Sequence, residues 1–222
     1  QLFGAANRPI YELKIPDLGV DATPLQGNGA TVTLSDGRSL VLSVLNLNYS
    51  LFGAWSLSPQ AVGGSASTAN LGIGISGYQT PAAAVPTGTA TYASGSGGVA
   101  GFAATPAGTG SLSGQASIGV NFSTGAVSGS LTGMTVTPAG GSAAAWNSVS
   151  LNGSLSGSSL SGTTAASGAA PGGTMAFDAS STGTFNGALF GPNGQELGAV
   201  WSLHDATGQG KSAIGYIGAT KQ

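Results

Sequence analysis

The feature that most constrains this fold is a long stretch without charged side chains, residues 39–177, built from short apolar segments between turn residues. Within a segment, apolar residues alternate with small or polar ones, as Ile118, Val120 and Phe122 do before a Thr-Gly turn. Alternation with a period of two is typical of strands that have one buried face. No window of ten residues has helical periodicity, so the sequence predicts an all-β fold.

The expected strands follow one another at the spacing of antiparallel sheets. Upstream, residues 11–20 offer one strand, residues 21–29 a loop, and Asp36-Gly37 the turn of a hairpin. A break in the alternation near Val44-Leu45 predicts a bulge or the start of a new strand. From Tyr49 onward the predicted strands are 49–57, 71–78, 87–93, 111–122, 126–136, 146–156, 159–165, 173–178, 182–190, 197–203 and 212–220. The predicted loops are 58–70, 79–86, 94–110, 137–145 and 165–173.

Small residues at alternate positions indicate a closed barrel. Glycine lets closely packed, strongly coiled strands bend at the corners of a small barrel. Closure also removes the open edge that a strand coated with Ser and Thr would otherwise expose. A β-solenoid would need a constant repeat, and none extends through the chain. The sequence therefore predicts an antiparallel barrel.

The scarcity of charge excludes several classes of partner. The chain has five Lys and Arg and seven Asp and Glu, so it lacks the basic stripe that neutralises nucleic-acid phosphates. It also lacks the basic cluster that holds a protein on anionic lipid. Cysteine is absent, which excludes disulfides and thiolate metal sites. No apolar run reaches the about eighteen residues of a transmembrane helix.

Catalytic motifs are missing as well. Residues 72–77 match G-x-G-x-x-G, but the prolines that follow forbid the long helix that a dinucleotide site requires. There is no G-x-S-x-G elbow, and beyond Arg38 the carboxylates are Asp178, Glu196 and Asp205 alone. With so few titratable groups, the sequence does not predict an enzyme.

Three residues are candidates for ligand binding. His204 is the single histidine, and we consider it either as a haem or metal ligand or as an exposed histidine at a strand end. Trp146 and Phe102 are the aromatic residues in or beside the predicted loops, where anchors for a partner are expected. Tyrosines 11, 49, 78, 92 and 216 are alternative iron ligands, but their rings are more typical of packed strand aromatics.

The end of the chain resembles a known family. The segment GTFNGALFGPNGQELGAVWSL, residues 183–203, followed by AIGYIGATKQ, is similar to the closing strands of the transferrin-binding protein B β-barrels. These carry a G-x-F-x-G-x-F-Y-G-P-x-A-x-E-L-G-G-x-F run and then a strand ending near F-G-A-K. The matching positions are Gly183, Phe185, Gly187, Phe190, Gly191, Pro192, Glu196, Leu197, Gly198, Trp201, Gly218, Ala219 and Lys221. Upstream, YSLFGAW (49–55) resembles the first barrel strand, and TPAAAVPTGTATYASG (80–95) resembles the segment that leads into the next strands.

The resemblance implies an eight-stranded antiparallel barrel at residues 49–222. Many family members carry a partly stranded domain, called the handle, before the barrel. Residues 1–48 would then form a small stranded extension that corresponds to a reduced handle. It also implies export to the bacterial surface as a lipoprotein, or release. The chain begins at Gln1 without Met, as a chain trimmed of a signal peptide or of a lipid-carrying Cys would. Family members bind host proteins or, in the hemophilin branch, haem. This chain departs from the family in two ways: the tyrosine that the family has after Phe190 is missing, and the chain has one barrel where a transferrin receptor has two. The resemblance therefore implies the same scaffold but does not imply transferrin binding.

The sequence thus leaves three hypotheses open. The first is a non-enzymatic surface or secreted binding protein for haem or a host protein, in which His204 would be the haem ligand. The second is a structural or adhesive component of a surface layer or matrix, whose low charge favours self-association. The third, an outer-membrane barrel, ranks last because the alternating Ser, Thr and Gly are too polar for a lipid-facing band.

Overall fold

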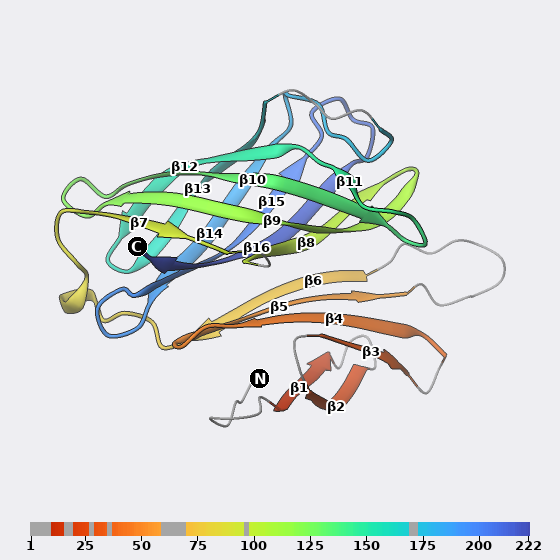
Figure 1. Cartoon of the computed structure of the whole chain (residues 1–222), viewed down its shortest axis with the longest axis horizontal. Helices are drawn as coiled ribbons and strands as arrows, with labels where there is room; N and C mark the ends of the chain where they lie inside the picture. Colours follow the sequence, from red (N-terminus) through yellow and green to blue (C-terminus); the bar gives the residue numbers. More distant parts are fainter. Residues whose placement is uncertain are drawn as a thin grey trace.

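A computed structural model describes residues 10–15, 20–26, 29–34, 37–58, 70–95, 98–168 and 173–222. Regular structure within these ranges is β-strand, apart from one turn of 3-10 helix, η2 (Ala82–Ala84). Figure 1 shows a barrel with a smaller body of strands beneath it. In the part of the chain that is described, no helix has the length and apolarity to cross a membrane. The all-β prediction is confirmed.

The barrel contains antiparallel strands in which each pairs with its neighbour and the last closes onto the first. They are β7 (Thr89–Ala93), β8 (Val99–Thr105), β9 (Gly108–Asn121), β10 (Ala126–Pro138), β12 (Ser148–Ser156), β13 (Ser159–Ser167), β14 (Thr182–Phe190), β15 (Glu196–His204) and β16 (Ser212–Lys221), with β11 (Ala144–Ala145) paired to β10. β7 and β8 share one position in the wall, because both pair with β9 on one side and with β16 on the other. The wall therefore has eight positions, and the eight-stranded barrel is confirmed.

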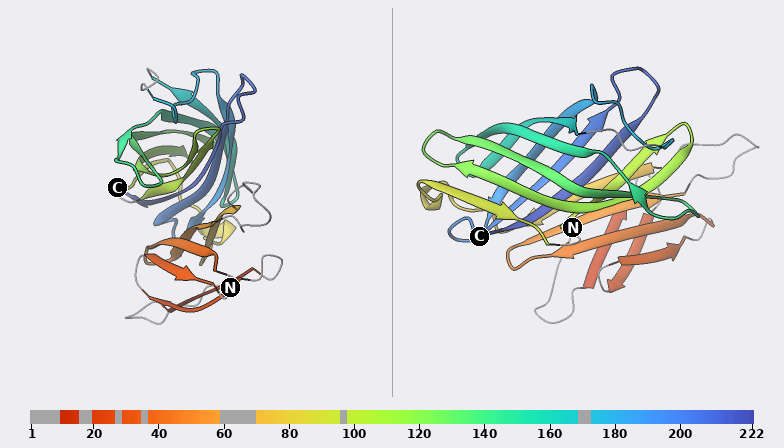
Figure 2. Two further views of the ribbon diagram at one scale, coloured as in Figure 1. Left: turned by 90° about the vertical axis from the view of Figure 1, so that its right-hand side faces the viewer. Right: turned by 45° about the horizontal axis from the view of Figure 1, so that its top comes forward.

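The N-terminal part forms two further sheets. A four-stranded antiparallel sheet has the order β3 (Gly29–Thr33), β4 (Ser39–Asn46), β5 (Ser50–Leu57) and β6 (Asn70–Gly77). We call it the N-terminal sheet. A separate hairpin joins β1 (Ile10–Ile15) to β2 (Val20–Gln26). The end-on view in Figure 2 shows this part on one side of the barrel wall, which confirms the predicted stranded extension.

Several strand predictions are wrong in detail. Residues 49–55 are not the first barrel strand, because β5 pairs with β4 and β6 inside the N-terminal sheet. Residues 94–110, predicted as a loop, contain β8, and residues 21–29, also predicted as a loop, contain most of β2. Residues 173–178, predicted as a strand, form a turn and irregular backbone. For residues 49–55 the reason is physical. The alternation of apolar and polar residues indicates which face of a strand is buried, but it does not indicate which strand it pairs with.

The break predicted near Val44-Leu45 is also absent. β4 pairs with β5 without a register shift from Leu40 to Asn46. Leu42 and Val44 are buried on one face of the sheet, while Leu45 packs against the barrel from the other face. Apolar residues occur on both faces of β4 because both faces are covered, and not because the strand is interrupted.

The barrel interior is filled by side chains. Trp146, Phe177, Phe185 and Trp201 are buried there together with aliphatic residues from every wall position. Glycine in the wall makes room for these rings: a methyl group at Gly153 would lie 2.8 Å from Cζ of Phe185. A barrel of eight strands is just wide enough to be filled in this way, so the surfaces available for binding are the outer wall and the loops.

The N-terminal sheet packs on the outer wall of the barrel around an aromatic contact. Phe52 of β5 and Tyr216 of β16 are both buried, with ring centroids 5.6 Å apart and an interplanar angle of 30°. Phe52 lies over the paired residues Gly198 and Gly218, whose lack of side chains leaves space for the ring. This contact places the sheet against β15 and β16 and leaves hollows along both of its flanks.

Candidate binding groove

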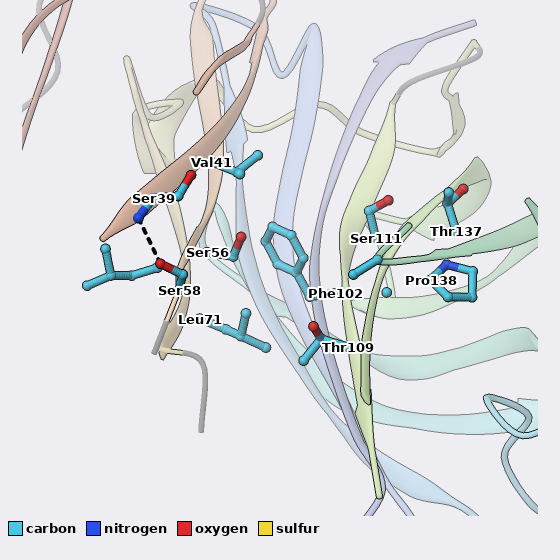
Figure 3. Close-up of a pocket in the computed structure, with 13 residues that line it drawn as sticks. Ser39, Val41, Ser56, Ser58, Leu71, Phe102, Thr109, Ser111, Thr137 and Pro138 are labelled. Carbon is cyan, nitrogen blue, oxygen red and sulfur yellow. Dashed lines mark hydrogen bonds between the residues drawn. The ribbon is translucent and has the colours of Figure 1, made fainter. Parts of the chain in front are cut away.

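One hollow separates the N-terminal sheet from the barrel strands β8, β9 and β10, and we call it the β8 groove (Figure 3). It has a volume of about 460 Å³ and adjoins a second hollow of about 520 Å³, which shares Leu71 and Phe102 with it. The sheet contributes Ser39, Val41, Ser56, Leu57, Ser58 and Leu71, and the barrel contributes Phe102, Thr109, Gly110, Ser111, Thr137, Pro138 and Ala139.

Phe102 reaches the β8 groove because of the strand period. Its neighbour Ala103 is fully buried in the barrel interior, so Phe102 points to the outer wall. There it is 8% exposed and lies across the hollow from Leu71. Val41 on the sheet side is 41% exposed, which leaves apolar surface open to a ligand.

The lining of the groove determines what it can do chemically. Every polar side chain in it is a Ser or Thr hydroxyl, and none of the lining residues titrates near neutral pH. Hydroxyls donate and accept hydrogen bonds, and the apolar residues bury ligand surface. General acid or base catalysis needs a titratable group within reach of the substrate, so this groove can bind but has no such group for proton transfer.

The three predicted site residues do not come together. Phe102 lines the β8 groove, whereas Trp146 is 4% exposed inside the barrel, where its Nε1 donates to the Met175 carbonyl at 2.9 Å. His204 is exposed at the end of β15, opposite Ser212 and outside the linings of both hollows. Within the described residues, no group of three or more His, Cys, Asp or Glu is placed to hold a metal ion.

The loop after His204 is ordered by its own carboxylate. Asp205 accepts hydrogen bonds from Oγ1 of Thr207 at 2.8 Å, from the Thr207 amide at 3.1 Å and from the Gln209 amide at 3.0 Å. The Thr207 hydroxyl, and then the backbone bonds, hold the pKa of Asp205 below its usual value. This carboxylate is thus engaged within residues 205–209 and is not part of the β8 groove.

Sequence reasoning missed most of the groove. It selected Phe102 as a loop aromatic, but it did not select Leu71 or Val41, nor the hydroxyls of Thr109 and Ser111. Nothing local distinguishes these residues from other strand positions. The groove exists only because the N-terminal sheet and β8–β10 are brought side by side.

Comparison with known proteins identifies the scaffold. The family model described as the C-lobe and N-lobe beta barrels of Tf-binding protein B matches residues 84–221. The chain is similar to transferrin binding protein B of Neisseria meningitidis, with 23% identity and a TM-score of 0.60 over 95% of this chain and 39% of that one. A transferrin binding protein B mutant from Haemophilus parasuis gives 18% identity and a TM-score of 0.63 over 100% of this chain and 42% of that one.

A third solved structure is the N-lobe domain of lactoferrin binding protein B of Moraxella bovis. It is 9% identical, with a TM-score of 0.51 over 82% of this chain and 79% of that domain. A search of curated protein sequences gives no match. The chain spans about two fifths of the length of the two transferrin binding proteins. Because the family model covers more than half of the chain, the predicted resemblance is confirmed: the chain belongs to the transferrin-binding protein B β-barrel family of bacterial surface binding proteins.

Proposed function

We propose that this chain is a non-enzymatic binding protein, exported to the bacterial surface or secreted, that holds an uncharged part of a host or extracellular protein in the β8 groove. The observation that carries the proposal is the lining of that groove, which combines Phe102, Leu71 and Val41 with hydroxyl groups and contains no charged side chain. A charged ligand would lose its hydration there without gaining a partner.

The chemistry of the groove favours a protein ligand. A few central apolar anchors surrounded by polar contacts carry most of the energy of protein interfaces. Phe102 and Leu71 supply the anchors, because each lines both adjoining hollows. The hydroxyls of Thr109, Ser111 and Ser56 surround them and supply the polar rim.

We further propose that the N-terminal sheet is a reduced handle for the barrel. The strand pairings change from one sheet to the other after Gly77, so we place the boundary between the two units there and not at residue 48. In this arrangement the β8 groove lies between handle and barrel, and both contribute to binding.

The test is biolayer interferometry with the immobilised chain and three named probes: transferrin, lactoferrin and haemin. The first two are the ligands named for the relatives of known structure. Saturable binding of one of the two proteins, weakened about tenfold or more by Phe102→Ser, would support the β8 groove as the site. Tyr78→Ser is the control for an aromatic substitution elsewhere on the surface, because Tyr78 is 58% exposed and lies outside the groove.

Each alternative has its own signature. Binding that survives Phe102→Ser would overturn the β8 groove as the site. A saturable Soret band with haemin that is lost in His204→Ala would replace the proposal with haem binding at His204. Assembly that rises with protein concentration, without binding of any probe, would support a structural, self-associating role.

A further inference from the structure

Within the described part of the chain, strand β6 forms an edge of the N-terminal sheet. Among the described strands it pairs only with β5, and the pairing runs from Asn70 to Gly77 without a register shift. Natural sheets protect such edges with charged side chains, proline or bulges. The sequence of β6, NLGIGISG, contains neither charge nor proline.

The backbone groups at this edge can be assigned from the hydrogen-bond pattern. The amide of Tyr78 donates to the carbonyl of Tyr49 at 2.9 Å, so this pair, one step beyond Gly77 and Ser50, is a hydrogen-bonded pair. Hydrogen-bonded and non-hydrogen-bonded pairs alternate along an antiparallel ladder. The N–H and C=O groups of the odd-numbered residues Leu71, Ile73 and Ile75 therefore point away from β5, toward the open edge.

A groove runs beside this edge, and we call it the β6 groove. It consists of two hollows of about 320 and 480 Å³ that share Asn186 and Val200 of the barrel wall. β6 forms one side, and the barrel wall at β14 and β15, with single residues of β13 and β16, forms the other. The lining includes Leu71, Ile73 and Ile75 on the side of β6 and Thr184, Asn186 and Val200 on the side of the barrel, and no residue of the lining is charged.

One end of the β6 groove is closed by the chain itself. Beyond Gly77 the backbone crosses to the barrel, where Gln79 forms an antiparallel bridge with Phe190. Thr80 then anchors the crossing, because its Oγ1 donates to the Gly191 carbonyl at 2.7 Å. From this closed end, β6 and the barrel wall enclose a slot with a row of backbone hydrogen-bonding groups along one side.

We propose that the β6 groove binds an extended, uncharged segment of a partner protein, which adds to β6 as a further antiparallel strand. Strand addition satisfies the outward groups of Leu71, Ile73 and Ile75, and alternate side chains of the segment then face the barrel wall. That wall presents Thr184, Asn186 and Val200, which suits Ser, Thr or Val in the segment. A charged residue at these positions would be desolvated without a partner. This surface adjoins the β8 groove at Leu71, which lines both. The proposal rests on the outward backbone groups of β6 and does not require a ligand in the β8 groove.

The probe is a terminally blocked peptide, acetyl-Thr-Val-Ser-Val-Thr-Val-Ser-amide, added to the full chain. Amide hydrogen exchange is followed by NMR at β6. We expect the exchange of the Leu71, Ile73 and Ile75 amides to slow about tenfold or more, while even-numbered amides, already bonded to β5, change little. The matched control is the same peptide N-methylated at alternate residues, which cannot complete the ladder and should give no protection.

Two variants test the site independently. Ile73→Pro removes one outward N–H without removing a bond to β5, and it should abolish peptide binding. Gly74→Ser is its control, because a side chain at Gly74 has no heavy atom within 4 Å and Gly74 belongs to the ladder with β5. Asn186→Lys is the second variant, and it decides alone if Ile73→Pro does not fold: Asn186 is exposed, and the substitution places a long charged side chain in the groove.

Three results would overturn the proposal. One is an absence of protection at the odd-numbered amides, and another is equal protection by the N-methylated peptide. The third is protection that rises with protein concentration in the absence of peptide, which would assign the edge to pairing between copies of this chain. Loss of binding in both Ile73→Pro and Asn186→Lys, with binding retained in Gly74→Ser, supports the proposal.

Discussion

At the scale of single residues, Glu196 determines how the two units are joined. It is 1% exposed, and its carboxylate accepts bonds from the Asn48 amide at 2.7 Å, the Tyr49 amide at 3.1 Å and the Ser50 hydroxyl at 2.6 Å. In Glu196→Gln an NH2 group replaces one acceptor and faces these donors. We expect the free energy of unfolding to fall by about 1–3 kcal/mol, measured by urea denaturation. Asp178→Asn, at an exposed carboxylate, should change it little, and equal effects of the two variants would contradict this role.

Two buried tyrosines should make the free energy of unfolding depend on pH in the alkaline range. Burial raises the pKa of Tyr92 from 10.0 to about 12, and burial also raises the pKa of Tyr216, against a hydrogen bond with Ser43 that lowers it. The unfolded chain therefore releases these protons at lower pH than the folded protein does. Their contribution to stability is complete below pH 10 and is lost as the pH rises toward 12. The urea midpoint should fall in this window, and it should fall less in Tyr92→Phe than in the parent protein, because Tyr216 still contributes in the variant. An equal fall in the two proteins would contradict a contribution from Tyr92.

At the scale of elements, the pair β15 and β16 accepts the N-terminal sheet because Gly198 and Gly218 lie opposite each other. A methyl group at Gly198 would lie 2.5 Å from Cε1 of Phe52 and 2.9 Å from Cε2 of Phe190. Gly198→Ala should therefore displace the Phe52 ring and lower the free energy of unfolding by about 1–3 kcal/mol. Gly74→Ala is the control, because a methyl group there has no heavy atom within 4 Å, and it should be neutral or slightly stabilising.

At the scale of the whole molecule, the apolar contact around Phe52 and the buried Glu196 predict that the N-terminal sheet and the barrel unfold together. Calorimetry should give one transition in the parent protein. Phe52→Ala should lower the free energy of unfolding by about 3–5 kcal/mol and separate the transitions of the two units. Two transitions in the parent protein would show that the interface does not couple them.

Much of the secondary structure is predictable from the sequence because strand signals are local. The alternation of Ile118, Val120 and Phe122 predicts β9, and the residues before and after Gly191-Pro192-Asn193-Gly194 predict β14 and β15. The closure of the sheet into a barrel is also predictable, because small residues at alternate positions allow the strong coiling that a barrel wall needs. β8 escaped prediction because Val99–Thr105 is rich in small residues, with Phe102 as its large side chain. The sequence pattern of this segment therefore predicts a loop that contains Phe102.

By itself, the sequence determined the all-β class, most strands, the barrel and the scarcity of charge that shapes every surface. The tertiary structure alone decided which strands pair, and therefore where the grooves lie. Ser50–Leu57 has a strand pattern that suits either sheet, and only its register with β4 and β6 places it outside the barrel. Phe102 and Leu71 are far apart in the chain and meet across a groove only after both sheets have formed. The physical reason is that alternation specifies the two faces of a strand, while its partner is selected by contacts between distant segments.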